Sequence, residues 1–213
     1  MKLDNKRTIL TGFAFLSICA FWQMYNSIVP LILTNTFHLN ETYSGAIMAA
    51  DNVLALFLLP LFGAISDKTH TRIGKRMPFI LFGTGLAIIL MNLLPLIDNS
   101  YAAAPTTFKT VSFVVVLGLL LVAMGTYRSP AVALMPDITP KPLRSKGNAI
   151  INLMGALGGV IYLGVAAVMY PNSKVEGLAH VNYQPLFMVV SAIMFVAIAV
   201  LFLCLLYTSD AAD

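Results

Sequence analysis

Charged residues gather in one short segment between two apolar stretches, in the pattern G-x3-D-K-x3-R-x-G-K-R-x-P-F over residues 63–79. Its acid, Asp67, would end an apolar helix, where the partial negative charge of the helix C-terminus disfavours a carboxylate. We therefore expect Asp67 to have a cationic partner or a neighbouring helix N-terminus. Gly63 favours close helix packing, Gly74 permits a tight turn, and Pro78 suits the first turn of a helix. Lysines and arginines alone would indicate only a basic loop, but this combination indicates a defined motif.

A second charge lies within an apolar run. Arg128 is eight residues before Pro136, which puts it roughly 12 Å deep at about 1.5 Å per residue. An arginine at that depth costs at least about 2.5–3.5 kcal/mol, so it is expected to face water, an acid or a ligand. The alternative is a side chain that snorkels to the lipid headgroups. We favour a functional role, because snorkelling from this depth strains the side chain.

Asp51 is the one acid that we expect deep in an apolar run. Its level and that of Arg128 differ by roughly 15 Å at about 1.5 Å per residue, so a direct ion pair is not expected. One hypothesis makes Asp51 a proton carrier, because burial or a neighbouring charge can adjust the proton affinity of a carboxylate. The alternative is a structural aspartate that hydrogen-bonds to a neighbouring helix.

Polar and aromatic residues interrupt two other apolar runs. Trp22, Gln23 and Asn26 lie near the middle of the first run, although tryptophan normally sits at the membrane interface. Trp22 and Asn26 share one helix face. A flat ring beside amides suits a sugar, which has apolar C–H faces and hydroxyl edges. The alternative is helix packing with the amides as interhelical hydrogen-bonding groups. Asn152 in the fifth run is a weaker candidate for the same cavity.

Membrane-spanning helices must position these residues. The chain has 213 residues, 59% hydrophobic and 10% charged, whereas soluble domains average about 25% charged. Six apolar runs approach the roughly 20 residues that cross a bilayer. They cover about residues 8–36, 43–65, 78–97, 110–135, 147–170 and 185–203. The sequence therefore predicts an all-α membrane protein of six transmembrane helices.

The basic residues predict the orientation. Ten of the 13 lysines and arginines fall in the N-terminal tail and the second and fourth loops, and only Lys109 and Lys174 fall in the opposite loops. By the positive-inside rule, the N-terminus is cytoplasmic. We thus expect a multi-pass protein of the cell membrane.

Several function classes are excluded by what the sequence lacks. It has no H-E-x-x-H helix, no Ser/His dyad and no paired aspartates at membrane depth, so an intramembrane enzyme is not expected. The three histidines fall in separate loops and the two cysteines in apolar runs, so neither a metal site nor a disulfide is implied. No cofactor and no nucleic-acid partner is expected.

The last ten residues, 204–213, have an unusual sequence. They read CLLYTSDAAD, an uninterrupted match to the translation of a common transposase-type sequencing adapter. We expect this segment to be non-native, Cys204 included, and the reading frame to have been interrupted inside the sixth helix. Without its two acids, the formal net charge rises from +4 to +6.

Two segments carry a family resemblance. Residues 63–79 resemble the loop between helices 2 and 3 of the major facilitator superfamily, in the form typical of sugar–cation symporters. These include sucrose/maltose-type proton symporters and the glycoside–pentoside–hexuronide group. Residues 127–150 resemble the R-x7-P-D-x-T-P-x3-R-x3-N-A-I segment of sucrose-type symporters, with Gly147 where that family has alanine. The resemblance implies the N-terminal six-helix bundle of a 12-helix transporter, built as two inverted three-helix repeats, with the C-terminal half missing.

The resemblance also implies roles for these residues. The gating motif would comprise Gly63, Asp67, Lys68, Arg72, Gly74, Lys75 and Arg76. Arg128 would lie in the sugar pathway. The sodium-using melibiose-type branch has two acids on helix 2 where this chain has Ala55 and Leu59, which favours protons over sodium.

The sequence thus predicts a secondary active transporter in the lipid bilayer, which couples protons to symport of a di- or oligosaccharide such as sucrose or maltose. The substrate-binding candidates are Arg128, Trp22, Gln23, Asn26 and Asn152, and the proton-coupling candidate is Asp51. Two alternatives stay open: a transporter of another small solute in the same superfamily, and a sodium-coupled glycoside symporter. A channel or structural subunit is disfavoured by the gating motif and the intramembrane charges.

Overall fold

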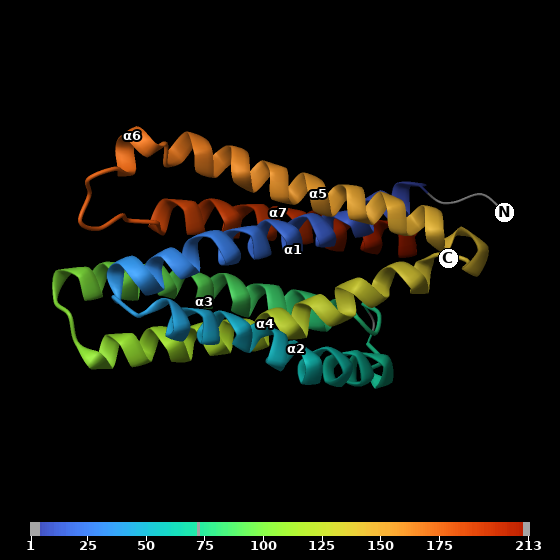
Figure 1. Cartoon of the computed structure of the whole chain (residues 1–213). Coiled ribbons are helices and arrows are strands. Elements are labelled where there is room, and N and C mark those ends of the chain that lie inside the picture. The colour runs from blue at the N-terminus through green and yellow to red at the C-terminus, as the bar shows by residue number, and fades with distance from the viewer. Residues whose placement is uncertain (1–4, 72, 211–213) are drawn as a thin grey trace.

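The computed structural model describes residues 5–71 and 73–210, with side chains for 7–71 and 73–203. Within this range six long helices run back and forth along one axis (Figure 1). They are α1 (Asn5–Leu31), which continues into the π-helical turn η1 (Ile32–Thr36), α2 (Glu41–Lys68), α3 (Met77–Ala103), α4 (Thr107–Ile138), α5 (Arg144–Met169) and α7 (Gln184–Asp210). A 3-10 turn, η2 (Lys141–Leu143), precedes α5, and the one-turn helix α6 (Asn172–Val175) precedes α7. All six are long and apolar enough to cross a membrane, which confirms the six-helix fold.

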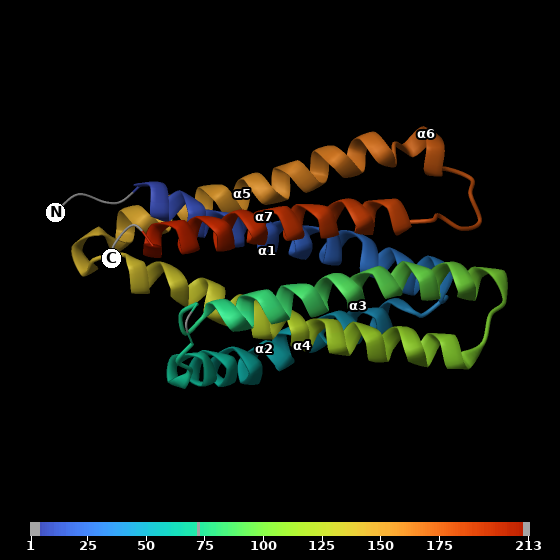
Figure 2. The same cartoon turned by 180° about the vertical axis from the view of Figure 1, so that it is seen from behind.

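The bundle has two distinct ends. The basic end carries the loops 69–76 and 139–143, and the far end carries the loops 37–40, 104–106 and 170–183. Figures 1 and 2 show the start of α1 and the end of α7 at the basic end, on the same side as these two loops. The segments that hold most of the lysines and arginines therefore share one end of the molecule.

One helix is longer than predicted, and this corrects the inventory of buried acids. The third span was expected to end at residue 97, but α3 continues to Ala103. Asp98 therefore lies on the helix, and it is fully buried. The prediction that Asp51 would be the only deep acid was wrong. The apolar run of the third span ends at the polar sequence Asp98-Asn99-Ser100. The far-end segment 170–183 lies over that sequence and keeps Asp98 from solvent.

The helix pairings have an internal symmetry. α1 packs on α5 and α7, α4 packs on α2 and α3, and α3 also meets α7. Exchanging α1 with α4, α2 with α5 and α3 with α7 turns the α1–α5 contact into α4–α2, and the α3–α4 contact into α7–α1. Both views show α1, α5 and α7 on one side of the bundle and α2, α3 and α4 on the other (Figures 1 and 2). Two interleaved three-helix repeats produce this arrangement.

Glycines allow the closest helix contacts. A Cβ at Gly83 of α3 would lie 2.8 Å from the backbone nitrogen of Tyr127 on α4, and Gly158 of α5 abuts the backbone of Leu16 on α1. By contrast, α2 and α5 expose large apolar side chains, among them Leu56 and Val160. In a bilayer such faces meet lipid or another protein surface.

Candidate functional site

Two hydrogen bonds flank Arg128 and fix its position in the bundle. Tyr127 is fully buried and donates from its hydroxyl to the carbonyl of Ala14 on α1 at 2.9 Å. Ser129 donates to the carbonyl of Leu59 on α2 at 2.7 Å. α4 is therefore tied to α1 by the residue before Arg128 and to α2 by the residue after it.

Arg128 packs on Trp22. Its guanidinium carbon lies 5.5 Å from the centroid of the indole ring, which is a cation–π contact. Trp22 is held in turn by edge-on contacts with Phe21 and Tyr25, at centroid distances of 5.4 and 5.2 Å. The buried indole Nε1 has no hydrogen-bond partner among the described residues. The arrangement presents a planar cation and a free N–H donor at mid-helix. A snorkelling arginine would instead extend toward the basic end.

A narrow pocket between α2 and α4 joins Arg128 to Asp51. Its volume is about 20 Å³, room for about one water molecule. Trp22, Asp51 and Arg128 line it together with apolar residues of α2 and α4. Because the lining runs from Asp51 to Leu59 on α2 and from Leu121 to Arg128 on α4, the two charged residues lie toward opposite ends. Among the described side chains no ion pair joins them, in keeping with the predicted offset.

Asp51 presents an unpaired atom to this region. Its Oδ1 is buried and has no hydrogen-bond partner among the described residues. Buried polar atoms are nearly always paired, so a buried carboxylate oxygen without a partner is a candidate for a functional role. Ala55 and Leu59, the positions of the two acids in the sodium-using branch, line the same pocket.

The remaining candidates do not reach this pocket. Gln23 is half-buried, and Asn26 and Asn152 are exposed on α1 and α5. The structure therefore brings Trp22, Asp51 and Arg128 together and leaves these three amides apart from them. An amide exposed at membrane depth is unfavourable against lipid, so Asn26 and Asn152 require a polar environment outside the described residues.

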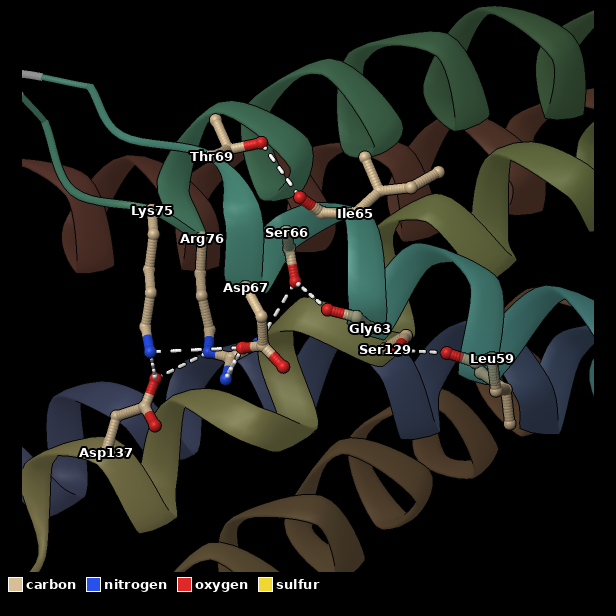
Figure 3. A network of polar contacts seen from close by, with 10 residues as sticks. All are labelled: Leu59, Gly63, Ile65, Ser66, Asp67, Thr69, Lys75, Arg76, Ser129 and Asp137. Carbon is tan, nitrogen blue, oxygen red and sulfur yellow. Dashed lines mark hydrogen bonds and ion pairs between the residues drawn. The ribbon is translucent and has the colours of Figure 1, made fainter.

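At the basic end, Arg76 organises the residues that we call the latch network: Ser66, Asp67, Lys75, Arg76 and Asp137 (Figure 3). The Arg76 guanidinium donates to Asp67 Oδ1 at 2.7 Å, to Asp137 Oδ2 at 2.6 Å and to Ser66 Oγ at 3.0 Å. Lys75 Nζ lies 3.4 Å from Asp137 Oδ2 and 3.8 Å from Asp67 Oδ1. One side chain therefore links the ends of α2 and α4 to the start of α3.

Local backbone geometry builds this network. Gly74 has a φ of +93°, a conformation that side-chain-bearing residues rarely adopt, and its N–H donates to the carbonyl of Thr71 at 3.0 Å. This turn brings Lys75 and Arg76 beneath the end of α2. Gly63 faces α4, where a Cβ would lie 3.2 Å from Ser129 Oγ. The small residue thus lets α2 approach α4 at the base of the network.

Burial separates the members of the latch network. The Arg76 side chain is 7% exposed, whereas Asp67 is 54% and Asp137 is 32% exposed. Arg76 supplies the cationic partner that Asp67 was expected to need. Asp137 belongs to the second motif, and its pairing with the first motif was not predicted from the sequence. The signal was present, because Asp137 is also an acid at the C-terminal end of an apolar helix.

Two residues of the gating motif, Lys68 and Arg72, do not belong to the latch network as defined above. Lys68 is exposed at the end of α2, and Arg72 lies outside the described residues.

Comparisons with known proteins identify the family of the chain. A family model described as Major Facilitator Superfamily matches residues 11–213. The sucrose transport protein SUC3 of Arabidopsis thaliana is 28% identical over 160 residues, which cover 68% of this chain and 26% of the relative. The sucrose transport protein SUT3 of Oryza sativa subsp. japonica is 31% identical over 123 residues, which cover 51% of this chain and 24% of the relative. The matched region thus spans about a quarter of these relatives.

Proposed function

Because the chain belongs to the major facilitator superfamily, whose members are transporters and not enzymes, we propose that it is the N-terminal half of a proton-coupled sugar symporter. It would work by alternating access, with the substrate near the middle of the membrane between two six-helix halves. One observation carries this proposal: Trp22, Asp51 and Arg128 line a single pocket at mid-helix.

Each residue of the pocket has a role in the proposal. The Trp22 ring offers an apolar face to the C–H face of a sugar, and its unpaired N–H offers a donor to a hydroxyl oxygen. Arg128 donates to further hydroxyl oxygens from a fixed position over the ring. Asp51 binds the proton through its unpaired carboxylate oxygen. Gln23, Asn26 and Asn152 are second candidates, which would contribute if the other half closes over the exposed faces of α1 and α5.

The substrate class rests on the relatives. Two proteins named for sucrose transport match 160 and 123 residues of this chain. We therefore propose a di- or oligosaccharide such as sucrose or maltose. Protons are the favoured coupling ion, because the two α2 positions that carry acids in the sodium-using branch are Ala55 and Leu59.

The latch network fits the proposed cycle as a gate. Arg76 holds α2, α3 and α4 together at the basic end, which is the cytoplasmic end if the basic loops follow the positive-inside rule. Breaking its ion pairs with Asp67 and Asp137 would free α2 and α4 to move apart. The protein would then be a multi-pass cell-membrane protein with a cytoplasmic N-terminus.

A second half is part of the proposal. Amides exposed at membrane depth, those of Asn26 and Asn152, need a polar covering surface. We propose that residues 204–213 are adapter-derived and that the native chain continues beyond Leu203 into six further helices. Sequencing the genomic locus across codon 203 tests this. A native codon series that encodes CLLYTSDAAD followed by a stop would refute it.

Counterflow of labelled sucrose and maltose in proteoliposomes that contain the complete transporter tests the function. We expect Arg128→Lys to lower exchange at least tenfold, because a lysine cannot present the planar guanidinium over Trp22. Arg144→Lys is the matched control, since Arg144 binds carbonyls at the basic end. Exchange of an unrelated solute but of neither sugar would overturn the substrate class.

Asp51→Asn tests the coupling. The variant removes the proton site but keeps the shape of the side chain. We expect it to lose proton-driven accumulation while it retains counterflow. Accumulation at the wild-type level would end the coupling role of Asp51.

A further inference from the structure

A buried acid at the far end has no part in the proposed sugar pathway. Asp98 on α3 is 0% exposed, and the side chains that face its carboxylate include the Thr36 hydroxyl and His180. The nearest cationic group is His180 of the segment 170–183, whose Nε2 lies 3.7 Å from Asp98 Oδ2. A buried carboxylate without a paired charge is costly, so its charge state depends on this imidazole.

A chain of hydrogen bonds fixes how His180 faces Asp98. The backbone N–H of Gln184 donates to Asn182 Oδ1 at 2.9 Å, so that oxygen also accepts from Asn99 Nδ2 at 2.8 Å. Asn99 Oδ1 is then the atom turned toward His180 Nε2, at 2.8 Å. Because an amide oxygen only accepts, Nε2 must carry a hydrogen. The second nitrogen, Nδ1, lies 3.4 Å from the hydroxyl of Thr36 and can be bare or protonated.

The other groups around Asp98 do not supply a charge. Thr36 from η1 is neutral. Tyr183 faces Asp98 from the end of the loop, and burial, with the Asp98 charge as a smaller cause, raises the pKa of its phenol. Lys109 from α4 donates to the carbonyls of Ser100 and Ala104, at 2.7 and 2.8 Å. Among the described residues, His180 is the one titratable group that forms an ion pair with Asp98.

We propose that Asp98 and His180 form a proton-binding site at the far end, and that closing the segment 170–183 over it takes up one proton above about pH 6.5. The site is separate from Asp51 and does not depend on the identity of the sugar. While the segment is closed, the pair holds one proton in either of two arrangements: aspartic acid beside neutral imidazole, or carboxylate beside imidazolium. Losing that proton would leave a net negative charge buried.

The pH dependence follows from counting protons. In water, aspartate is ionised above about pH 4 and histidine is neutral above about pH 6.5. Between these values the open pair also holds one proton, so closing is independent of pH. Above about pH 6.5 the open pair holds none, so closing takes up one proton and becomes up to tenfold less favourable per pH unit.

Hydrogen exchange of the intact chain in lipid nanodiscs tests the proposal. The protection of a peptide covering 176–186, corrected for the intrinsic rise of exchange with pH, reports closure of the segment. In the wild type we expect flat protection from pH 5 to 6.5 and a fall of up to tenfold per unit from pH 7 to 8.5. Flat protection over the whole range would overturn the proposal.

Two variants shift the profile in opposite directions. In Asp98→Asn the buried side chain is neutral, so closing the segment takes up no proton above about pH 6.5. Protection of the peptide 176–186 from pH 7 to 8.5 then becomes flat. His180→Gln obliges Asp98 to be protonated when closed, so protection falls already from about pH 4.5 upward. Asp67→Asn, an acid at the other end, is the control and keeps the wild-type profile. A wild-type slope in Asp98→Asn would refute the site, and protection of α4 verifies that each variant is folded.

Discussion

The two ends of the bundle solve the same problem, an acid next to a helix end, in different ways. At the basic end, the latch network surrounds a nearly buried arginine with two partly exposed acids. At the far end, a fully buried aspartate faces one histidine, and neutral amides of Asn99 and Asn182 hold that histidine in place. The first arrangement is rich in formal charge and open to water. The second carries almost no formal charge, and its aspartate is closed to water.

The two ends therefore differ in which interactions can be removed without a large loss of stability. Exposed ion pairs are individually weak, and salt screens them, but a buried arginine with three partners is costly to remove. At the far end the stability lies in a chain of short hydrogen bonds, and removing one link leaves buried groups unpaired. At the basic end, charges act through the attraction between opposite signs. At the far end, they act through the free-energy cost of burying a charge.

The largest expected effect is the loss of the central cation. Arg76→Ala should lower the free energy of unfolding by about 2–4 kcal/mol, because it removes the hydrogen bonds of a nearly buried guanidinium to Asp67, Asp137 and Ser66. Lys75→Ala, which removes a side chain that is 41% exposed, should cost less than about 1 kcal/mol. Thermal unfolding in detergent, followed by circular dichroism, compares the two. Equal losses would show that Arg76 is not the centre of the network.

A smaller effect is expected from breaking the amide chain. Asn99→Ala removes the donor to Asn182 and the acceptor for His180, which should cost about 1–2 kcal/mol of local stability. Hydrogen exchange in peptide 176–186 should accelerate roughly five- to thirtyfold, while peptides of α2 keep their rates. Asn152→Ala, on the exposed face of α5, provides the comparison and should leave the segment unchanged. Faster exchange throughout the bundle would contradict a local role.

The smallest effect is that of salt, and it distinguishes the ends directly. Raising the salt concentration from 0.1 to 1 M shortens the Debye length from about 10 to about 3 Å. Exchange in a peptide covering 64–76 should rise severalfold, because Asp67 and Lys75 are exposed to the added ions. Exchange at 176–186 should not change. A larger response at the far end would reverse the comparison.

The sequence predicts the basic end better than the far end for a physical reason. Charges in a short loop stand out against apolar runs, so Asp67 and its need for a cation are visible in the sequence alone. The cation that answers it, Arg76, and the second acid, Asp137, come together only through the fold. Likewise, Trp22, Asp51 and Arg128 were each identified from the sequence, but the pocket that joins them depends on how α1, α2 and α4 cross.

Asp98 could not be identified as buried from local sequence. It stands at the edge of an apolar run, beside two polar residues, and its cover comes from a segment about eighty positions later. Tyr127 could not be given a role from the sequence, because its acceptor, the Ala14 carbonyl, is a backbone group on a helix far away in the chain. Residues whose partners lie far along the chain carry no local pattern that would indicate them.

The interleaved pairing of the helices also has a consequence for biogenesis. The first helix packs on α5, so its main partner begins at Arg144, over a hundred residues after α1 ends at Leu31. At about 5–20 residues per second, the ribosome needs roughly 6–23 s to reach the start of that partner. During this interval α1, with Trp22 and its free indole N–H, must wait in the lipid or against the insertion machinery. The repeat that organises the finished bundle thus delays its assembly. Quality control has most time to act while the nascent first helix has no partner.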